Sequence, residues 1–323
     1  MSGSDLYGAI DLGGTNVRAI VADLDGNIAG EDSRLTETQR GTEGVFACMV
    51  ASLEAAAAVA GVRVADLGGV GIASPGTVDV TRGVVSEASQ LPDWNDVPLV
   101  EIMSRRLGVA VCLENDASAA ALGEHRFGAG RGTRHMLYLT VSTGVGGGII
   151  IQGELYRGAS GAAGELGHMI MDPDGPPCGC GARGCLEALA SGTAIAGRGE
   201  ELAAQGASKL LTQMRQREGP VTAEMMKRAA DAGDGDSRRV FREAGHYLGV
   251  ALASYVNIFS PDLILIGGGV ARAAEYFMEE AEQTMRTLAK GEPLKHVRLG
   301  LGELGDRAGS LGMIALMRGD EGR

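Results

Sequence analysis

The chain of 323 residues is short of basic side chains and has no long apolar run. Its 29 Lys and Arg residues stand against 41 Asp and Glu residues, for a net charge of −12. This balance argues against binding nucleic acid or polyphosphate through a broad basic surface, although backbone N–H groups could still hold a small anion. The Ala-rich stretch Leu53–Val62 is too short to span a bilayer and is flanked by polar residues. We therefore expect neither nucleic acid nor membrane among its partners.

Two other signals are missing. No signal-peptide pattern opens the sequence, so an oxidising compartment is not implied and we expect a cytoplasmic protein. No Gly-Lys-Ser/Thr follows the first glycine turn, which excludes a P-loop there. Glycine, in contrast, is abundant at 52 residues, which indicates many tight turns and sites lined by backbone.

Only five cysteines are present, and three of them fall within eight residues: Cys178, Cys180 and Cys185. His168 lies just before them. One imidazole and three thiolates satisfy the tetrahedral preference of zinc and leave no open position, so the ion would hold a loop in shape without activating water. The alternatives are an ordinary turn-rich loop, or one disulfide with a free thiol. Cys178 and Cys180 are too close for an easy disulfide, and the spacing favours structural zinc.

Apolar segments of strand length alternate with helical patterns, which predicts an α/β architecture. Helices are expected over Thr42–Val59 and Leu99–Leu107. Strands beginning at Leu6 and at Met136 each run into a glycine turn that carries a threonine, which suggests an internal duplication. Strand-to-helix spacing places a domain boundary near Asn115.

Three glycine turns could line a nucleotide site. In the first, Gly13 and Gly14 would let the backbone approach a phosphate, Thr15 would add a hydroxyl, and Asp11 could orient a hydrated Mg²⁺. A second turn carries Thr143 and Gly144, and two such loops could grip phosphates together. The third, Gly267–Gly269, would let an adenine or ribose lie flat against the backbone; a plain strand-to-helix turn is equally compatible with it.

Polar residues near these turns suit a sugar. Asp116 could be the general base that accepts a hydroxyl proton during phosphoryl transfer, with Asn115 orienting another hydroxyl. Either residue could instead simply cap a helix. Glu165, His168 and Glu187 could bind neighbouring hydroxyls, since carboxylates accept such pairs of hydrogen bonds. Gly76, in Ser74-Pro75-Gly76, could add backbone contacts.

These motifs together resemble the bacterial sugar kinases of the ROK family, most closely its glucokinases. The likeness runs from Asp11-Leu-Gly-Gly-Thr15 to Gly305-Asp306-Arg-Ala-Gly309. Its most specific part is Glu165-x-Gly-His168 followed by the cysteine run that ends in Cys185-x-Glu187.

The resemblance implies an actin-like ATPase (ribonuclease H-like) fold, with two α/β domains flanking a cleft. The small domain would cover residues 1–115 and be completed by a C-terminal helix at about 305–323; the large domain would cover 116–304 and hold the zinc loop. The implied reaction transfers the γ-phosphoryl of ATP, with Mg²⁺, to the 6-hydroxyl of a hexose, glucose first. A homodimer or homotetramer is also implied.

The resemblance further implies roles for individual residues. Asp116 would be the base. The sugar would be bound by Gly76, Asn115, Asp116, Glu165, His168 and Glu187. The nucleotide would be bound by Asp11, Gly13, Gly14, Thr15, Thr143, Gly144, Gly268 and Gly269, and structural zinc by His168, Cys178, Cys180 and Cys185. The chain departs from many relatives before its tryptophan, which leaves the parts of Ser89, Gln90 and Asn95 in sugar choice open.

Other functions remain open. Within the same family the substrate could be N-acetylglucosamine, N-acetylmannosamine or fructose. A non-catalytic, sugar-sensing ROK protein is a different class; those that repress transcription carry an N-terminal DNA-binding extension, for which we expect no room before Asp11. A silent sugar binder would not need both Asp11 and Asp116.

Overall fold

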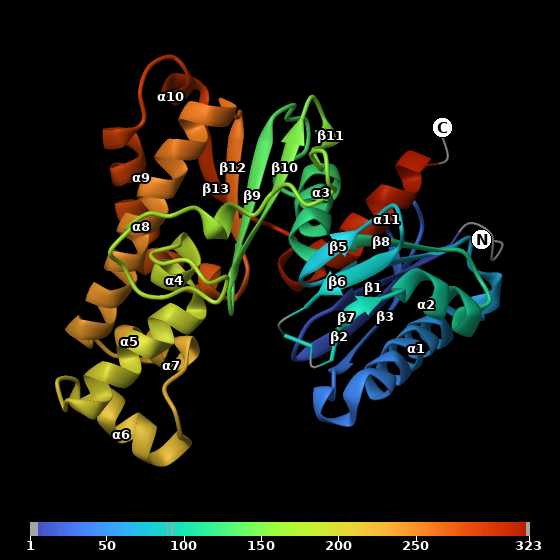
Figure 1. Cartoon of the computed structure of the whole chain (residues 1–323), viewed down its shortest axis with the longest axis horizontal. Helices are drawn as coiled ribbons and strands as arrows, with labels where there is room; N and C mark the ends of the chain where they lie inside the picture. The colour runs from blue at the N-terminus through green and yellow to red at the C-terminus, as the bar shows by residue number, and fades with distance from the viewer. Residues whose placement is uncertain (1–5, 89, 92, 321–323) are drawn as a thin grey trace. The chain divides into compact units, whose positions relative to one another are not determined.

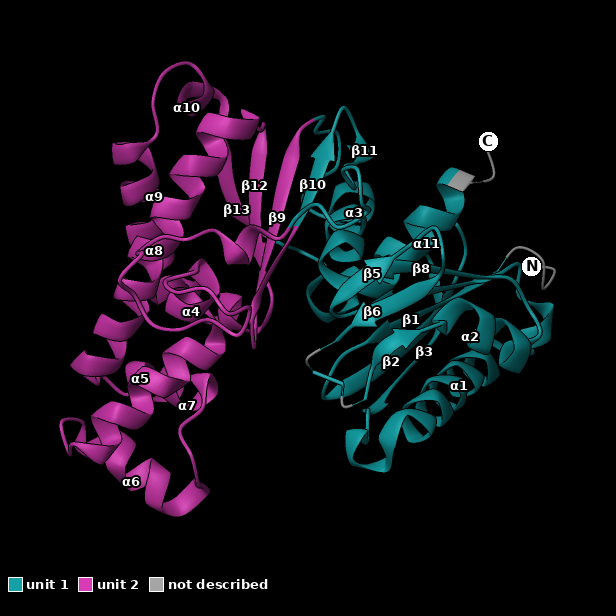
Figure 2. Ribbon diagram, in the orientation of Figure 1, with its two compact units in different colours: residues 1–134, 148–164, 302–323 teal, residues 135–147, 165–301 magenta. Residues whose placement is uncertain are grey.

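The computed structural model describes residues 6–88, 90–91 and 93–320, so Ser89 of the predicted sugar segment lies outside the described residues. The chain folds into two compact units (Figure 2). Unit 1 consists of residues 1–134, 148–164 and 302–323, and unit 2 of residues 135–147 and 165–301. The elements follow the chain in the order drawn in Figure 1.

Unit 1 is built on a five-stranded sheet with the order β3-β2-β1-β4-β8. Its strands are β1 (Tyr7–Leu12), β2 (Asn16–Ala22), β3 (Ile28–Leu35), β4 (Val70–Ser74) and β8 (Val111–Asn115). The first three form an antiparallel meander, whereas β4 and β8 run parallel to β1. The carboxyl ends of β1, β4 and β8 therefore lie along one edge of the sheet.

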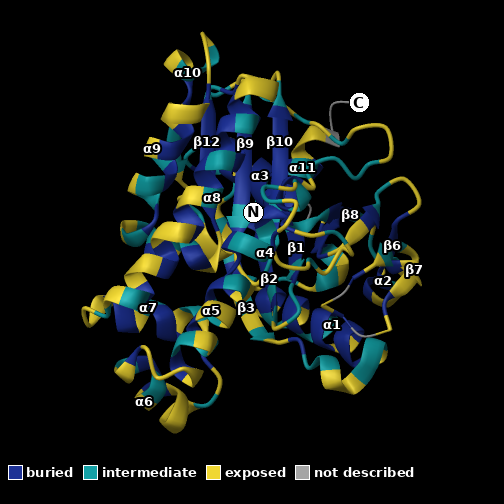
Figure 3. Cartoon of the chain, turned by 60° about the vertical axis from the view of Figure 1, so that its left-hand side comes forward, coloured by how far each residue is buried: buried dark blue, intermediate teal, exposed yellow. Residues whose placement is uncertain are grey.

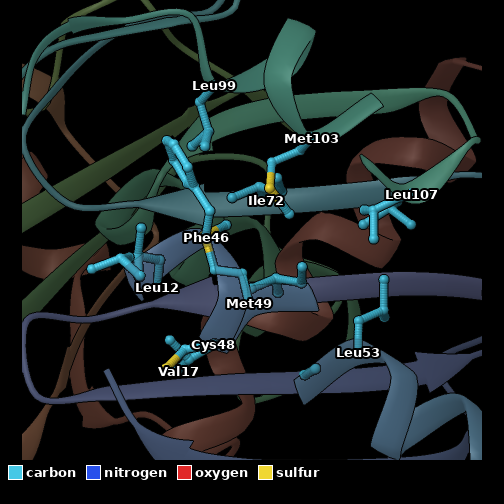
Figure 4. Packing of buried hydrophobic residues seen from close by; sticks show 14 of the residues in the cluster. Leu12, Val17, Phe46, Cys48, Met49, Leu53, Ile72, Leu99, Met103 and Leu107 are labelled. Atoms are coloured by element: carbon cyan, nitrogen blue, oxygen red, sulfur yellow. The ribbon is translucent and has the colours of Figure 1, made fainter. Parts of the chain in front are cut away.

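Helices cover both faces of this sheet. Because successive side chains of a strand point to opposite faces, Ile10 and Leu12 join one apolar cluster while Ala9 joins another. The first cluster includes side chains of α1 (Gly41–Ala60) and α2 (Leu99–Leu107), and Figure 4 shows its packing. The second includes side chains of α3 (Asp116–Phe127) and α11 (Ala308–Asp320). A small antiparallel sheet completes the unit, with strands β5 (Thr77–Asp79), β6 (Val84–Glu87) and β7 (Asn95–Val97).

Helix α1 is long and apolar enough to cross a membrane by length and composition alone, counted from Thr38 to Ala60. Its apolar side chains, such as Phe46, Met49 and Leu53, are buried in the first cluster of unit 1. These contacts account for its apolar character as that of a core helix.

The second five-stranded sheet has the order β11-β10-β9-β12-β13. Its strands are β9 (Met136–Val141), β10 (Val145–Ile151), β11 (Glu154–Leu155), β12 (Leu263–Gly267) and β13 (Arg298–Leu301). Strand β12 runs parallel to both β9 and β13, and β9 and β12 are buried along most of their length (Figure 3). The two strand orders match position by position, as the predicted duplication requires.

Four of the helices of unit 2 begin where a polar side chain caps them. The helices of this unit are α4 (Leu186–Ala190), α5 (Gly192–Ala204), α6 (Lys209–Glu218), α7 (Ala223–Asp231), α8 (Gly235–Phe259), α9 (Met278–Leu288) and α10 (Pro293–His296). Ser191, Ser208, Thr222 and Asp234 each accept a hydrogen bond from the backbone N–H three residues on, which opens α5 to α8 in turn. Short 3-10 segments complete the element order: η2 (Thr38–Arg40), η3 (Val64–Asp66), η4 (Leu166–His168), η5 (Gly269–Tyr276) and η6 (Gly305–Arg307).

The division into units corrects the predicted boundary at Asn115. That position lies inside unit 1, because α3 packs closely against α11. Two glycines allow this approach: a Cβ added at Gly312 would clash with the Ala119 carbonyl oxygen, and one added at Gly123 would clash with the Ala308 carbonyl oxygen. The C-terminal helix therefore lies in unit 1 together with α3. The chain passes between the units four times, so no single cut separates them.

The close approach of α11 to α3 predicts a large cost for one added methyl group. A Cβ at position 312 would stand 1.7 Å from the Ala119 carbonyl oxygen, so the helices must separate in Gly312→Ala. We expect a loss of about 2–3 kcal/mol of unfolding free energy, measured in urea. Gly319→Ala is the matched control in the same helix, because nothing lies within 4 Å of its added Cβ. Equal stabilities of the two variants would contradict the packing argument.

Candidate functional site

In unit 1 the strand register brings two predicted site segments to the same edge of the sheet. Asp11 on β1 is paired with Ala73 on β4, and Ala73 is paired with Glu114 on β8. Asp11 and Glu114 are thus two strands apart, about 10 Å between their Cα atoms. The segment Asn115–Asp116 and the first glycine turn both continue from this edge. The candidate base, Asp116, and the carboxylate that could orient magnesium, Asp11, therefore lie at the same edge of one sheet.

The first glycine turn is held by backbone hydrogen bonds. Gly13 N–H donates to the Asn16 carbonyl at 2.9 Å, and the Thr36 hydroxyl donates to the Gly13 carbonyl at 2.6 Å. Thr15 is exposed, and its carbonyl accepts from Thr36 N–H at 2.9 Å. The turn is therefore preformed, and the Thr15 hydroxyl is accessible to a ligand.

Asp11 lies near the end of β1, just before this turn, and its surroundings disfavour the charged form of its carboxyl group. Burial raises the pKa of Asp11 to about 6; the nearby Arg18 opposes the shift and Asp306 adds to it. Gly309 of α11 faces the carboxylate so closely that a Cβ there would lie 2.9 Å from it. A carboxyl group kept in so unfavourable a place is typical of functional sites, where a cation can compensate the charge.

Asn115 and Asp116 open helix α3. The Asn115 carbonyl oxygen Oδ1 accepts from the N–H groups of Ala117 and Ser118 at 3.0 and 3.1 Å, so the helix-cap interpretation of Asn115 is confirmed. Its amide Nδ2 also donates to the Gly76 carbonyl at 3.2 Å, which joins the predicted sugar residues Asn115 and Gly76. Asp116 is half-buried and accepts from Ala117 N–H at 2.8 Å through Oδ1.

Gly76 itself is required by backbone geometry. Its φ is +85°, and an added Cβ would stand 2.0 Å from the Glu87 carbonyl oxygen. Only glycine fits this approach without rearrangement. The hydrogen bond from Asn115 to the Gly76 carbonyl thus brings Gly76 next to Asn115 and Asp116 in unit 1.

In unit 2 the four predicted zinc ligands come together. Their ligand atoms all lie within 4.8 Å of one another. Cys178 Sγ is 3.6 Å from His168 Nδ1, and Cys180 Sγ is 3.7 Å from Cys185 Sγ. In a tetrahedral site with Zn–S bonds of about 2.3 Å, neighbouring ligand atoms are about 3.5–3.8 Å apart. The donor set therefore fits a four-coordinate soft ion, and all three cysteines are free, which excludes the disulfide alternative.

Two of the three thiols, those of Cys178 and Cys185, lie where the thiolate form is disfavoured. Burial, together with the neighbouring thiols, raises the pKa of Cys185 to about 12, and burial also raises the pKa of Cys178. A bound metal ion reverses this situation, since it deprotonates a coordinating thiol outright. The cluster has the properties expected of a metal site that folds around its ion.

The loop that carries the ligands is anchored to the rest of unit 2. The buried Tyr255 donates its hydroxyl hydrogen to the Leu166 carbonyl at 2.6 Å, beside His168. Gly184 has a φ of +64° and lies against the Asp172 backbone, where no Cβ fits. The hydrogen bond at Leu166 therefore holds the backbone between Glu165 and His168.

His168 uses its two ring nitrogens differently. Nδ1 faces Cys178 within the ligand cluster, and Nε2 lies 3.9 Å from an oxygen of the exposed Glu165. A metal-bound histidine commonly faces a carboxylate in this way, which orients the ring. Glu165 and His168 are therefore brought together as predicted.

Glu187 is placed differently from a simple sugar ligand. Its Oε2 accepts from Val145 N–H at 3.0 Å, and its Oε1 lies 3.8 Å from Cys178 Sγ. Glu187 thus connects the cysteine loop to the glycine turn that holds Thr143 and Gly144. Sugar contact by Glu187 stays a prediction, and its link to the glycine turn is a feature that the sequence did not indicate.

The two predicted nucleotide turns of unit 2 are neighbours. Gly267 is paired with Thr140 across β12 and β9, so both turns leave the same edge of the sheet. Gly268 has a φ of +84°, and an added Cβ would lie 2.5 Å from the Val141 carbonyl oxygen. The Thr143 carbonyl accepts from the Thr193 hydroxyl at 2.7 Å, which ties this turn to α5.

Two residues of unit 1 add to what the sequence indicated. Gln90, exposed in the segment before Trp94, packs against Gly14: an added Cβ there would lie 3.0 Å from Gln90 Cβ. This places Gln90 beside the first glycine turn; its part in sugar choice stays a prediction. Sequence reasoning missed the second, Glu114, a carboxylate buried at the end of β8. An acidic residue closing an apolar strand, just before Asn115–Asp116, was the available signal.

Comparison with known proteins settles the family. A family model described as "ROK family" matches residues 7–320. This chain belongs to the ROK family. A glucokinase of Thermotoga maritima is 39% identical over 269 residues, which cover 82% of each protein. A crystal structure of a ROK family glucokinase from Streptomyces griseus, in complex with glucose and AMPPNP, superimposes with a TM-score of 0.85. It is 34% identical and covers 97% of this chain and 99% of that one.

The ROK family also includes a transcriptional regulator whose crystal structure is similar to this chain, with a TM-score of 0.84 and 26% identity. A putative xylose repressor of Caldicellulosiruptor sp. is 33% identical over 315 residues, which cover 96% of this chain and 77% of the repressor. The likeness to the ROK glucokinase structure confirms the predicted α/β fold of the actin-like ATPase class.

The raised pKa of Asp11 predicts that the free energy of unfolding depends on pH. Between its ordinary value of 3.8 and about 6, the folded protein holds a proton on Asp11 that the unfolded chain does not hold. The contribution of Asp11 to stability is therefore least favourable above pH 6 and improves as the pH falls through 6 towards 4. We expect Asp11→Asn to stabilise the ligand-free protein at pH 8 by on the order of 1–2 kcal/mol, and by less at pH 5. Urea unfolding at both pH values measures this, and a variant no more stable than wild type at pH 8 would contradict it.

Proposed function

We propose that this protein is an ATP-dependent sugar kinase that transfers the γ-phosphoryl group to the 6-hydroxyl of a hexose, with glucose as the first substrate to test. The observation that carries the proposal is the meeting of Asp11 and Asn115–Asp116 at one edge of the first sheet. Likeness to a glucokinase whose structure holds glucose and AMPPNP supports it.

In this proposal Asp116 is the general base. A sugar hydroxyl is a weak nucleophile, and a carboxylate within hydrogen-bond reach can accept its proton as the phosphoryl group transfers. Helix α3 begins at Asp116, so the position of this carboxylate follows from the end of β8 and from the Asn115 cap. Asn115 and the backbone at Gly76 would bind neighbouring hydroxyls of the same sugar.

The glycine turns would hold the nucleotide. Gly14 and Thr15 would turn backbone N–H groups and the exposed Thr15 hydroxyl toward phosphate oxygens, while the hydrogen bond from Gly13 N–H to the Asn16 carbonyl holds the turn in shape. Magnesium, when bound with ATP, would neutralise developing charge on the phosphates, and Asp11 would orient its water ligands. In unit 2, the turns at Thr143–Gly144 and Gly268–Gly269 would also offer glycine backbone to a nucleotide.

Zinc on His168, Cys178, Cys180 and Cys185 would act on structure alone. With four protein ligands the ion has no position for water or substrate. It would stiffen the loop that presents Glu165 and the Nε2 edge of His168 to sugar hydroxyls. The expected homodimer or homotetramer and the cytoplasmic location stay predictions.

A sugar-responsive regulator is the second candidate, because a putative xylose repressor covers 96% of this chain in alignment. Kinases for N-acetylglucosamine, N-acetylmannosamine and fructose are alternatives within the first candidate. A coupled ADP-release assay over glucose, mannose, fructose and the two N-acetyl sugars distinguishes them. ADP release on any of these sugars supports a kinase and ranks its substrates, whereas sugar binding with no ADP release would favour the regulator.

The base assignment predicts a separation of turnover from binding. Asp116→Asn keeps the size of the side chain but cannot accept the proton, so we expect the kcat for the best hexose to fall by at least about a hundredfold. Hexose binding measured by calorimetry should change little. Asp66→Asn, which breaks a surface ion pair with Arg63, is the control and should turn over normally. Wild-type turnover in Asp116→Asn would remove Asp116 from the role of base.

The zinc assignment predicts coupled loss of metal and stability. Cys180→Ser removes one thiolate, and we expect less than about one-tenth of an equivalent of zinc by elemental analysis, with a lower Tm. Cys112→Ser, on β8 in unit 1, is the control and should keep one equivalent. A full equivalent of zinc in Cys180→Ser would show that this thiolate is not a ligand.

A further inference from the structure

Glu114 is a buried carboxylate that the proposed reaction does not use directly. Its side chain is 1% exposed at the end of β8. Oε1 accepts from the backbone N–H of Asn115 at 3.0 Å, and Oε2 accepts from Arg157 Nε at 2.8 Å. The two oxygens therefore hold two different parts of unit 1 at once.

The first of these parts is the segment that carries the base. Asn115 is held at its backbone N–H by Glu114, while its side chain caps α3 and donates to the Gly76 carbonyl. Asp116 follows directly and begins the helix. A shift of the Asn115 peptide would therefore move both Asn115 and Asp116, and small displacements of a catalytic group cost rate steeply.

The second part is the loop that begins at Arg157. The Arg157 carbonyl accepts from Ala163 N–H at 3.1 Å, which closes the loop on itself. Gly158, Gly161 and Gly164 all have positive φ, so the loop's path depends on glycine. The hydrogen bond from Arg157 to Glu114 ties the start of this loop to the buried end of β8.

The charge arrangement explains why the two residues are needed together. A buried carboxylate without a partner is strongly destabilised, whereas one paired with a guanidinium and bonded to a backbone N–H is satisfied on both oxygens. The Arg157 side chain is 33% exposed, so water reaches the guanidinium partner of the pair, whereas the Glu114 carboxylate is buried.

We propose that Glu114 and Arg157 form a positioning pair for phosphoryl transfer: Arg157 neutralises Glu114, and Glu114 fixes the peptide from which Asn115 and Asp116 act. Neither residue touches the reacting atoms. The proposal rests on the proposed function, since it gives the pair a kinetic role only if Asp116 serves the transfer.

The test uses Arg157→Met in the full-length protein. This change leaves Glu114 buried and unpaired, so we expect kcat for the best hexose to fall at least about tenfold, while the KM for ATP stays within about twofold. Arg157→Lys restores the charge and should recover part of the loss. The control Arg63→Met breaks an exposed ion pair with Asp66 in the same unit and should leave kcat unchanged.

A double variant distinguishes positioning from bulk stability. In E114Q/R157M no unpaired charge is buried at this pair, and the amide oxygen introduced at position 114 can still accept from Asn115 N–H. We expect this variant to turn over at least about threefold faster than Arg157→Met, a non-additive result that two independent losses would not produce. Circular dichroism and Tm establish that each variant is folded, and kcat is compared per folded molecule.

Three outcomes decide the matter. If wild type is active and Asp116→Asn is inactive, wild-type kcat in folded Arg157→Met would overturn the positioning pair and leave the proposed function standing. A double variant no faster than Arg157→Met would also overturn it. If wild type phosphorylates no sugar, the proposed function and the positioning pair fail together.

Discussion

The hydrogen-bonded register of β1, β4 and β8 is the constraint on which the site in unit 1 depends. Parallel pairing places the ends of these strands at one edge, so whatever follows each strand gathers there. A glycine turn follows β1, Gly76 lies just beyond β4, and Asn115–Asp116 ends β8 and begins α3. Because the register is set by buried apolar side chains on both faces, a slip would cost the core as well as the site.

The second sheet has the same strand arrangement, but different chemical groups lie at the ends of its strands. The turns after β9 and β12 lie at one edge and supply glycine backbone, and Thr140 stands near the end of β9, where the first sheet has Asp11 near the end of β1. One sheet thus carries the proposed acid–base chemistry, and the other offers backbone donors. Unit 2 adds the cysteine loop, in which Glu187 links the metal ligands to the turn at Val145.

Two carboxylates in unfavourable surroundings belong to residues that serve the proposed site: Asp11 is half-buried and Glu114 is buried. Asp11 lies under the first glycine turn with a raised pKa, and Glu114 is balanced by Arg157. Removing a carboxylate from water, even in part, costs free energy, and neither residue is needed to fill an apolar core. A molecule shaped for stability alone would have replaced them, so their presence fits a site whose geometry matters more than its contribution to folding.

Much of this could be predicted from local pattern. The alternation of strands and helices, the glycine turns with threonine, and the spacing of His168, Cys178, Cys180 and Cys185 are local signals, because each depends on residues near one another in the chain. The grouping of the candidate metal ligands and the α/β class followed from them. The helix-cap and base interpretations of Asn115 and Asp116 could not be separated, since both residue types suit both roles.

The domain boundary, the bond from Glu187 to Val145, and the pairing of Glu114 with Arg157 were decided only by the tertiary structure. Each joins segments far apart in the chain, 43 residues in the case of Glu114 and Arg157. Helix α3 belongs to unit 1 because α11, at the far end of the chain, packs on it through Gly312. Local sequence determines which elements form and which chemical groups are available. Which groups meet depends on packing between distant elements, which no local pattern contains.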